Sequence, residues 1–258
     1  MLKDNAYFKC HCGQSVCIER FLCCTSTQDM AKVILSRKNT FLNILLLISE
    51  NQVYGQSRKG FDWLSPPGAM SGTYIISYPS QASSMVRFSS MTAALSVAEM
   101  LGSIGISSKI KWENDVFVDE CKISGILSEE VKNSRDNSYV LVGIGINCNI
   151  DTNITGFENY SSILSKTGKK LEMKVLWETL SSRILVNFGE LFSSGFEGIC
   201  ERINKALLWR GRSASFSSHK NGTTIGILVK IDEFGRAILR ENNGNETPCS
   251  HGSLKLNA

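Results

Sequence analysis

The sequence predicts an α+β fold in two parts, a larger body followed by a small all-β unit. In the body, residues 1–209, two candidate strands joined by a short connection stand among helical segments. Such a mixture of hairpins and helices is typical of α+β rather than doubly wound α/β folds. After residue 209, short β-prone runs alternate with turns, which predicts a β unit over residues 210–258. At about 48 residues this unit would be marginal by itself, so we expect it to pack on the body.

Length and composition fit a folded protein of this kind. The chain has 258 residues, of which 42% are hydrophobic, and its formal net charge is +4, from 28 Lys and Arg against 24 Asp and Glu. That apolar fraction is too high for a disordered chain. The longest unbroken apolar run, residues 44–48, is far short of the ~20 residues of a membrane helix, and the N-terminus shows no signal peptide. We therefore expect a cytoplasmic protein with no membrane partner.

Nine cysteines occur, and five of them lie within the first 24 residues beside His11. They leave two interpretations, a zinc site or free thiols. No CxxC pair is present, although zinc sites are commonly built from such pairs. Free thiols in a reducing compartment are therefore favoured, and we expect no metal ligands among the site residues.

The elements of the first half follow from caps and apolar spacing. Ser26 and Thr27 supply hydroxyl caps and Asp29 an acid in the first turn, which predicts a helix from about residue 26. Short apolar runs predict buried strands at residues 43–49 and 73–78, on either side of a polar, glycine-bearing segment. A long helix follows, marked at spacings of three and four by Phe88, Met91, Leu95, Ala98 and Leu101.

The second half of the body begins with two candidate strands, residues 110–118 and 122–129. Asp119 and Glu120 form a short connection between them, so we expect a hairpin. Residues 139–148 predict another strand, which contains glycine. Two helices complete the body, marked by Val175, Leu176, Leu180, Ile184, Phe188 and Leu191 and then by Phe196, Ile199, Ile203, Leu207 and Leu208.

Four segments have a composition that suggests chemistry, and the first is residues 55–63 (GQSRKGFDW). Glycines let main-chain N–H groups approach an anion closely, and Arg58 and Lys59 add positive charge. The loop can therefore close on an anionic ligand. A solvated polar loop is the alternative, and this segment alone favours it. No Gly-Lys-Ser/Thr ending is present, so the loop is not a P-loop.

The other three segments are also weak when each is taken alone. Residues 111–115 (KWEND) can wall and charge a pocket or form an Asn-Asp turn. Lys122 begins an apolar strand in residues 122–127 (KISGIL), where it either meets an anionic partner or extends its stem to solvent. Residues 143–147 (GIGIN) alternate glycine in a strand, which indicates close approach by a ligand or a bend without function.

Taken together and in this order, the four segments resemble the motifs of the biotin protein ligases. The corresponding stretches of that family read GRGRxGxxW, KWPND, K(I/L)xGIL and GxGIN, and Ser26-Thr27 matches the family's S-T-N/Q. The resemblance covers most of the chain, from about residue 22 to the C-terminus. It implies a mixed β-sheet flanked by helices, of the class II synthetase-like catalytic type, followed by a small SH3-like β domain.

The resemblance also implies an activity. Biotin and ATP give biotinyl-5′-adenylate and pyrophosphate, and the adenylate then acylates one lysine in the biotin acceptor domain of a biotin-dependent carboxylase. ATP implies Mg²⁺ as a companion ion. Because the first step joins two anions, cationic groups that clamp the α-phosphate should dominate catalysis.

Individual roles carry over where residues match the motifs. The catalytic residues implied are Arg58 to hold phosphate, Lys122 to bridge the biotin carboxylate and the α-phosphate, and Asp115 to accept the proton of the incoming lysine. The implied biotin-binding positions are Ser26, Thr27, Gln52, Gly55, Gln56, Lys122 and Gly125. The implied ATP- or adenylate-binding positions are Arg58, Lys59, Gly60, Trp63, Asn114, Asp115 and Asn147.

The sequence departs from the family motifs at three positions. Gln56 stands where the family has arginine and Ser57 where it has glycine, so one cation is missing and the loop backbone is stiffer. We therefore expect looser retention of the adenylate. Glu113 replaces the proline of KWPND, which leaves the turn at Asn114 less constrained.

Partners and alternatives complete the prediction. Some family members carry a winged-helix DNA-binding domain, but only about 20 residues precede the first matching strand, so we expect no DNA binding. An exposed sheet edge can pair, which leaves a homodimer open. Two competing functions are a lipoate or octanoate ligase of the same superfamily, and a degenerate member that binds biotin without transferring it.

Overall fold

The structure is a computed structural model that describes residues 2–9, 15–37, 44–56, 62–132, 137–152, 159–218 and 222–257. Its centre is an eight-stranded sheet. In spatial order the strands are β1 (Leu2–Lys9), β2 (Ser15–Phe21), β3 (Ile44–Ser49), β6 (Ala69–Ser77), β10 (Ser138–Asn147), β9 (Cys121–Lys132), β8 (Asp115–Val118) and β7 (Lys109–Lys111). β2 and β3 run parallel and the other neighbours antiparallel, so the sheet is mixed. The predicted α+β class is confirmed.

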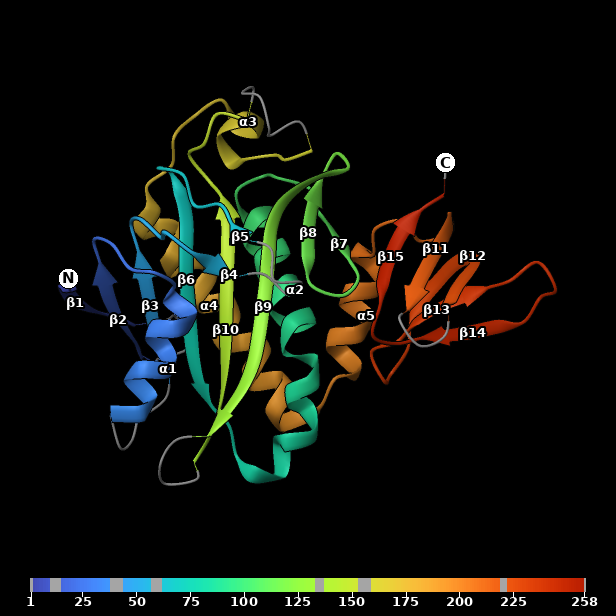
Figure 1. Cartoon of the computed structure of the whole chain (residues 1–258), viewed down its shortest axis with the longest axis horizontal. Helices are drawn as coiled ribbons and strands as arrows, with labels where there is room; N and C mark the ends of the chain where they lie inside the picture. The colour runs from blue at the N-terminus through green and yellow to red at the C-terminus, as the bar shows by residue number, and fades with distance from the viewer. Residues whose placement is uncertain are drawn as a thin grey trace.

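Helices cover both faces of this sheet (Figure 1). On one face lies α1 (Thr27–Arg37), and on the other lie α2 (Ser89–Ser103) and α4 (Met173–Ser194). Strand β3 shows why both faces are apolar, because alternate side chains of a strand point in opposite directions. Leu45 and Leu47 belong to the apolar cluster under α1, whereas Ile44 and Leu46 belong to the larger cluster with α2 and α4.

The remaining helices and a short hairpin surround this sandwich. They are η1 (Ser80–Phe88), α3 (Ile163–Thr167), α5 (Glu197–Ala206), and the two-stranded sheet of β4 (Gly55–Gln56) and β5 (Asp62–Trp63). Within the described ranges no helix is long and apolar enough to cross a bilayer.

The predicted and observed strand bounds differ, most clearly for two strands. The strand expected at residues 110–118 is interrupted, since β7 ends at Lys111 and β8 begins at Asp115. Between them Asn114 turns to bond Ile126 on β9, through its carbonyl and through its side chain. The strand expected from residue 73 begins at Ala69, because β10 continues to Asn147 and pairs with β6 over this whole length.

The predicted hairpin between β8 and β9 is confirmed. Its two connecting residues, Asp119 and Glu120, have φ angles of 49° and 63°. Positive φ at both central positions is the conformation of a type I′ turn, whose twist matches that of the flanking strands. The turn therefore fixes the register in which β9 presents its first residues, including Lys122, beside β8.

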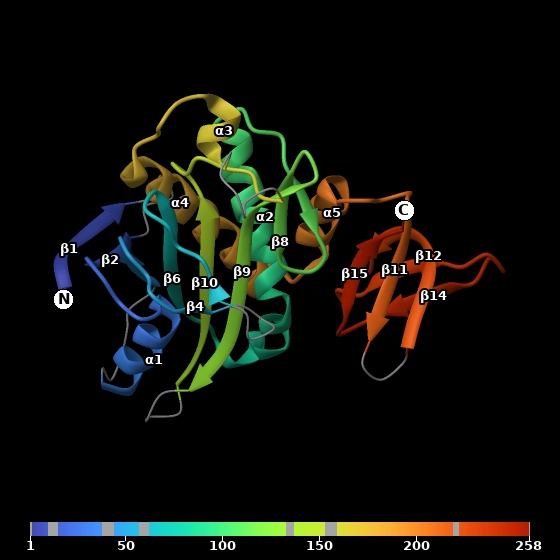
Figure 2. The ribbon, with the colours of Figure 1, turned by 45° about the horizontal axis from the view of Figure 1, so that its top comes forward.

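The C-terminal residues form a second, antiparallel sheet of five strands, in the order β14-β13-β12-β11-β15. The strands are β11 (Ser213–Ser218), β12 (Gly222–Ile231), β13 (Ala237–Arg240), β14 (Glu246–Cys249) and β15 (Ser253–Leu256). Figures 1 and 2 show this sheet beside α5, at the end of the body remote from β1. The all-β unit expected at the C-terminal end of the chain is confirmed.

The small sheet docks on the body through the turn between β12 and β13. Gly235 in this turn has a φ of 78°, which favours glycine, and a Cβ there would lie 2.7 Å from Met91 Cε and 3.0 Å from Phe88 Cε1. Trp112 Nε1 donates to the Gly235 carbonyl at 2.9 Å, and its ring meets Phe216 of β11 edge-on at 5.7 Å. The expected packing of the unit on the body therefore uses a tryptophan of the KWEND segment.

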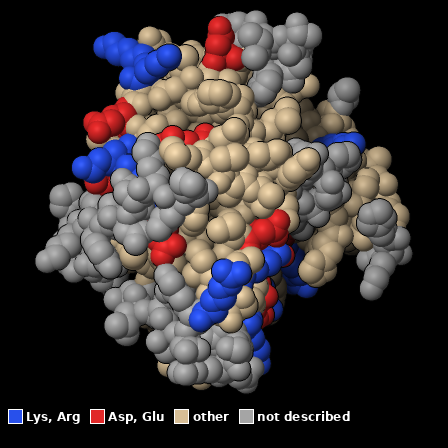
Figure 3. All heavy atoms as spheres, turned by 60° about the vertical axis from the view of Figure 1, so that its left-hand side comes forward, with Lys and Arg blue, Asp and Glu red and all other residues tan. Residues whose placement is uncertain are grey.

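Charged side chains are mixed on the face near β1 and β2. In Figure 3, basic and acidic side chains of the described residues stand close to one another around a broad uncharged area. This arrangement agrees with the small net charge of +4.

Candidate functional site

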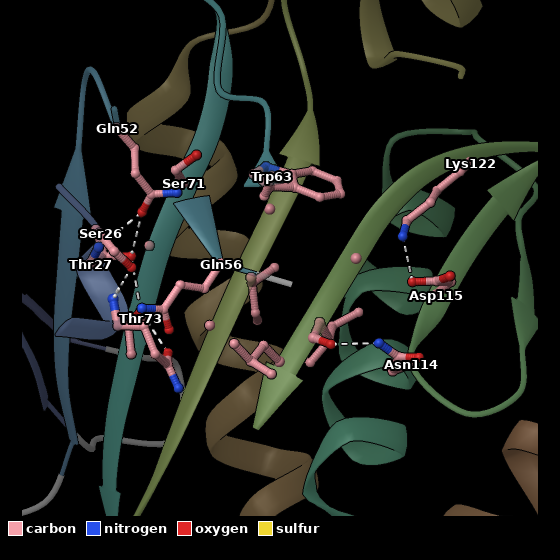
Figure 4. Close-up of a pocket in the computed structure, with 18 residues that line it drawn as sticks. Ser26, Thr27, Gln52, Gln56, Trp63, Ser71, Thr73, Asn114, Asp115 and Lys122 are labelled. Carbon is pink, nitrogen blue, oxygen red and sulfur yellow. Dashed lines mark hydrogen bonds and ion pairs between the residues drawn. The ribbon is translucent and has the colours of Figure 1, made fainter. Parts of the chain in front are cut away.

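A pocket opens where the N-terminus of α1 meets β4, β5, β6, β9 and β10. It encloses about 480 Å³, including its open mouth. Figure 4 shows two polar groups of side chains at its opposite ends, with Trp63 between them. The lining residues are Ser26, Thr27, Gln28, Gln52, Gln56, Trp63, Ser71, Gly72, Thr73, Asn114, Asp115, Lys122, Gly125, Ile126, Leu127, Gly143, Ile144 and Gly145.

One end of the pocket is a network of hydroxyl and amide groups. Thr27 donates to Gln52 Oε1 twice, from its backbone N–H at 2.9 Å and from its hydroxyl at 3.1 Å. The Thr73 hydroxyl donates in turn to Thr27 Oγ1 at 2.9 Å. Ser26 Oγ accepts the backbone N–H of Gln28 at 3.2 Å and so caps α1. The donors and acceptors at this end therefore have fixed directions, which suits a ligand with a polar head.

Glycines on β9 and β10 form the floor of the pocket, and Trp63 lies on it. Gly125 and Gly145 are opposite each other in the ladder. A Cβ on Gly145 would lie 2.3 Å from Trp63 Cε2, and one on Gly125 would lie 2.9 Å from Trp63 Cζ3. A Cβ on Gly143 would meet Gln28 Oε1 at 2.7 Å. The alternating glycines of residues 143–147 are thus explained by close approach of side chains that line the pocket.

The other end of the pocket carries charge. Lys122 Nζ lies 2.7 Å from Asp115 Oδ1, and both side chains are largely withdrawn from solvent, at 25% and 21% exposure. The same ammonium lies 5.4 Å from the centre of the Trp63 ring. Asn114 Nδ2 donates to the Ile126 carbonyl at 2.7 Å and holds the turn that presents Asp115. A half-buried ammonium of this kind can bind a carboxylate or a phosphate strongly.

A cysteine beside this pocket has a thiol whose protonated form is favoured. Cys24 forms an isolated parallel bridge with Gln52. Burial raises the pKa of the Cys24 thiol, and a hydrogen bond with Ser49 offsets this only in part. Because the thiolate is the reactive form, this shift in pKa makes the thiol less reactive at neutral pH. The chemistry of the site therefore rests on its hydroxyl, amide, ammonium and carboxylate groups.

Most of the sequence-predicted site residues that the structure describes come together in this pocket. They are Ser26, Thr27, Gln52, Gln56, Trp63, Asn114, Asp115, Lys122 and Gly125. Gly55 and Asn147 lie next to the lining residues. A Cβ on Gly55 would meet the Trp63 carbonyl oxygen at 2.4 Å, and the buried Asn147 donates to the Ser161 carbonyl at 3.0 Å. Arg58, Lys59 and Gly60 lie outside the described residues.

Trp112 does not line the pocket, although Asn114 and Asp115 of the same segment do. It is 6% exposed and points toward the C-terminal sheet, where it donates to Gly235. Of the two alternatives left open for this segment, the turn at Asn114 is present, and Trp112 is not part of the pocket wall. The cause is the turn at residues 112–114, which sends Trp112 and Asp115 in different directions.

Sequence reasoning missed several lining residues. Ser71 and Thr73 alternate on β6 and face the pocket, with the Ser71 hydroxyl 2.9 Å from that of Ser65. Two hydroxyl residues at period two within an apolar strand were the available signal. Gln28 was also missed, and its signal was its place directly after the Ser26-Thr27 cap. Ile126, Leu127 and Ile144 complete the pocket but look like ordinary core residues in the sequence.

Comparisons with known proteins agree with this geometry. The model of the biotin/lipoate A/B protein ligase family matches residues 23–147. A biotin–[acetyl-CoA-carboxylase] ligase from Paracoccus denitrificans is 26% identical over 214 residues, which are 78% of this chain and 85% of that protein. The bifunctional ligase/repressor of Bacillus subtilis is 26% identical over 208 residues, 77% of this chain and 62% of that protein.

Solved structures show the same architecture. Biotin protein ligase from Aquifex aeolicus, in complex with biotin and ATP, superposes with a TM-score of 0.79 at 26% identity, over 93% of this chain and 99% of that one. The match includes both the mixed sheet with its helices and the C-terminal sheet. From the motifs, the pocket and these similarities, residues 23–147 form a domain of the biotin/lipoate A/B protein ligase family, and the chain resembles biotin protein ligases.

Proposed function

We propose that the protein is an ATP-dependent biotin protein ligase, which forms biotinyl-5′-adenylate and transfers biotin to a lysine of an acceptor domain. The observation that carries this proposal is the arrangement of the pocket. A directed hydroxyl–amide network stands at one end, the Lys122–Asp115 pair at the other, and a glycine floor under Trp63 between them. This order matches a ligand with a polar head, an apolar chain and a terminal carboxylate.

Each part of the pocket supplies one requirement of binding. The ureido head of biotin brings fixed donors and acceptors, which the network around Thr27 and Gln52 can satisfy. The apolar tail can follow the Trp63 ring, whose buried Nε1 has no partner among the described residues. The carboxylate of biotin would then reach Lys122. To bind it, the Lys122 ammonium would move partly or wholly away from Asp115.

Lys122 has a chemical as well as a binding role in this proposal. Adenylation forms a bond between a biotin carboxylate oxygen and the α-phosphorus of ATP, and pyrophosphate leaves. An ammonium between the two anions lowers their repulsion and stabilises the charge of the transition state. Arg58, Lys59 and Gly60 remain predictions for the phosphate contacts, and Asn147 for a nucleotide contact.

Asp115 is placed to serve the second step. The acceptor lysine attacks the acyl carbon as a neutral amine, AMP leaves, and the amine proton needs a base. Asp115 lies beside Lys122 in the pocket, so a lysine that approaches the acyl group also approaches this carboxylate. One carboxylate would therefore first orient Lys122 and later accept a proton.

Mg²⁺ would enter with the nucleotide. Among the described residues no three His, Cys, Asp or Glu side chains gather in a way that could hold a metal ion. Within the part of the pocket lining that the structure describes, Asp115 is the carboxylate, so the ion would be held chiefly by the ATP phosphates and water, as Mg²⁺ often is. Bound there, Mg²⁺ would neutralise part of the phosphate charge.

The partner that fits this activity is the biotin acceptor domain of a biotin-dependent carboxylase. For transfer, the side chain of the acceptor lysine must enter the mouth of the pocket. The class of acceptor follows from the proposed ligase function. Because ATP is a substrate, we propose the cytoplasm as the compartment. The mixed charges of the face in Figure 3 and the net charge of +4 support the absence of DNA binding.

A single assay tests the proposal. Purified protein is mixed with Mg²⁺, ATP labelled at the α-phosphate and biotin, octanoate or lipoate, and acyl-AMP is measured before and after addition of an acceptor domain. A biotin-dependent adenylate that passes to the acceptor supports the ligase. An adenylate formed with octanoate or lipoate alone assigns the protein to the lipoate branch, and a biotinyl-adenylate that never transfers indicates a binding protein.

A further inference from the structure

A carboxylate outside the pocket accepts a hydrogen bond from one of the amide side chains that line the pocket. Glu129 on β9 accepts from Gln28 Nε2 at 2.7 Å and from Lys32 Nζ at 3.0 Å, so it joins β9 to two turns of α1. We propose that Glu129 is a positioning residue that fixes the Gln28 amide with its oxygen toward the pocket, as an acceptor for an N–H of the biotin head. This inference rests on the proposed function.

The orientation of the amide follows from the chemistry of its partner. An ionised carboxylate accepts hydrogen bonds and donates none. Gln28 must therefore turn its NH₂ toward Glu129, and its oxygen toward the other side. That oxygen lies 3.2 Å from the Thr73 hydroxyl and over Gly143, where a Cβ would stand only 2.7 Å away. With 3% of its surface exposed, Gln28 has little access to water that could replace a lost partner.

The same oxygen keeps acceptor capacity for a ligand. The Thr73 hydroxyl has one proton, which it shares between Thr27 Oγ1 at 2.9 Å and Gln28 Oε1 at 3.2 Å. The shorter contact goes to Thr27, whose own proton goes to Gln52. A carbonyl oxygen has two lone pairs, so Gln28 Oε1 is only weakly used by the protein. The ureido ring of biotin carries two N–H donors, and one of them can complete this acceptor.

Glu129 thus acts through Gln28, since it does not line the pocket itself. If the carboxylate were an amide, residue 129 could either accept from or donate to Gln28. The Gln28 amide would then have two arrangements of similar energy, and one of them would turn its NH₂ toward the donors of the ligand. Biotin binding should weaken, whereas the nucleotide contacts should not.

The test exchanges the two groups. Glu129→Gln is nearly isosteric and should raise the KM and the dissociation constant for biotin about five- to tenfold, with the KM for ATP unchanged, as expected for one compromised hydrogen bond. Gln28→Glu alone places two carboxylates in contact and should be worse. The double variant Gln28→Glu/Glu129→Gln again turns an acceptor-only oxygen toward the pocket, and should return both biotin constants to within about threefold of the unaltered protein.

Glu130 offers a matched control. It follows Glu129 on β9 but bonds the Tyr78 hydroxyl, on the opposite side of the strand. Glu130→Gln should leave the biotin constants unchanged. A Glu129→Gln variant with the normal biotin constants, or a double variant no better than Gln28→Glu alone, would overturn the inference. Those outcomes leave the ligase intact, whereas failure of the unaltered protein to bind biotin in calorimetry and to adenylate it overturns the proposed function instead.

Discussion

Gln56 Nε2 lies 2.9 Å from both carboxylate oxygens of Asp29, and this contact joins β4 to the first turn of α1. Gln56 stands where the resembling family has arginine, so a neutral amide makes a bond that could have been an ion pair. Gln56 is exposed and Asp29 is partly exposed, and such contacts contribute little to stability. Their effect should instead appear in how long the hairpin that carries Trp63 stays closed over the pocket.

The first prediction concerns release of the adenylate. Asp29→Ala removes the partner of Gln56 and should speed dissociation of biotinyl-adenylate several-fold, because β4 loses its hold on α1. Asp29→Asn keeps one acceptor oxygen and should have a smaller effect. Gln56→Arg with Ser57→Gly should slow release, as expected from the family loop. Stopped-flow fluorescence of Trp63 measures these rates, and equal rates in all four proteins would contradict the prediction.

The second prediction concerns the charged end of the pocket. Lys122→Ala removes the ammonium that lies 2.7 Å from Asp115 and should lower the adenylation rate at least about 100-fold. Asp115→Ala should impair adenylation and transfer alike, since it loses both the orientation of Lys122 and the base. Pyrophosphate exchange and single-turnover transfer separate the two steps. Lys166→Ala breaks an ion pair with Asp119 away from the pocket and serves as the control; a near-normal rate in Lys122→Ala would sink the assignment.

The fold could be predicted well wherever local patterns decide the structure. The cap at Ser26 and Thr27 and the turn at Asp119 and Glu120 carry their signals within a few residues. The start of β6 was predicted wrongly, because it depends on contacts with a distant part of the chain. β6 starts at Ala69 because β10 extends to Asn147, more than seventy residues later in the chain. No periodicity near Ala69 reports that pairing.

The candidate site was predicted from its motifs, and the remainder follows from contacts between distant segments. Lys122 and Asp115 are neighbours in a hairpin, so their pairing is close to local. Trp112, in contrast, points away from the pocket and donates to the Gly235 carbonyl in the C-terminal sheet. The proposed role of Gln28 depends on Glu129, about a hundred residues further along the chain. A single sequence does not reveal such pairs, because each residue has an ordinary alternative where it stands.

The third prediction tests the glycine floor. Gly145→Ala adds a Cβ about 2.3–2.6 Å from the Trp63 indole atoms, so the ring must leave the floor. The KM for biotin should rise about tenfold or more, and the fluorescence of Trp63 should shift. Gly189→Ala on α4 is the control, since a Cβ there meets nothing within 4 Å. It should stabilise the protein by about 0.5–1 kcal/mol and leave activity unchanged. An unchanged biotin KM in Gly145→Ala would refute the proposed floor.

The fourth prediction concerns the junction of the two sheets. Trp112→Phe keeps an aromatic ring but removes the N–H that donates to the Gly235 carbonyl. Since this carbonyl loses a buried donor, the free energy of unfolding should fall by about 1–3 kcal/mol. Phe234→Ala alters an exposed side chain of the same turn and should change the free energy of unfolding by less than about 0.5 kcal/mol. Urea denaturation measures both, and equal values for the two variants would contradict the role of Trp112.

The fifth prediction follows from a buried thiol next to β10. Cys148 is fully buried, and this burial raises the pKa of its thiol from 9.0 to about 12. The folded state therefore holds the proton more tightly than the unfolded state. The resulting stability is present below pH 9 and is lost as the pH rises from 9 toward 12, with a slope of up to about 1.4 kcal/mol per pH unit.

Variants without an ionisable group at this position isolate that slope. Cys148→Ala and Cys148→Val differ in the volume they leave or add, so their stabilities at pH 8 should differ. Neither can lose a proton, so both should lose less stability than the unaltered protein between pH 9 and pH 11, and by the same amount. Urea unfolding at each pH gives the comparison. A pH dependence identical to that of the unaltered protein would show that Cys148 ionises equally easily in the folded and unfolded states.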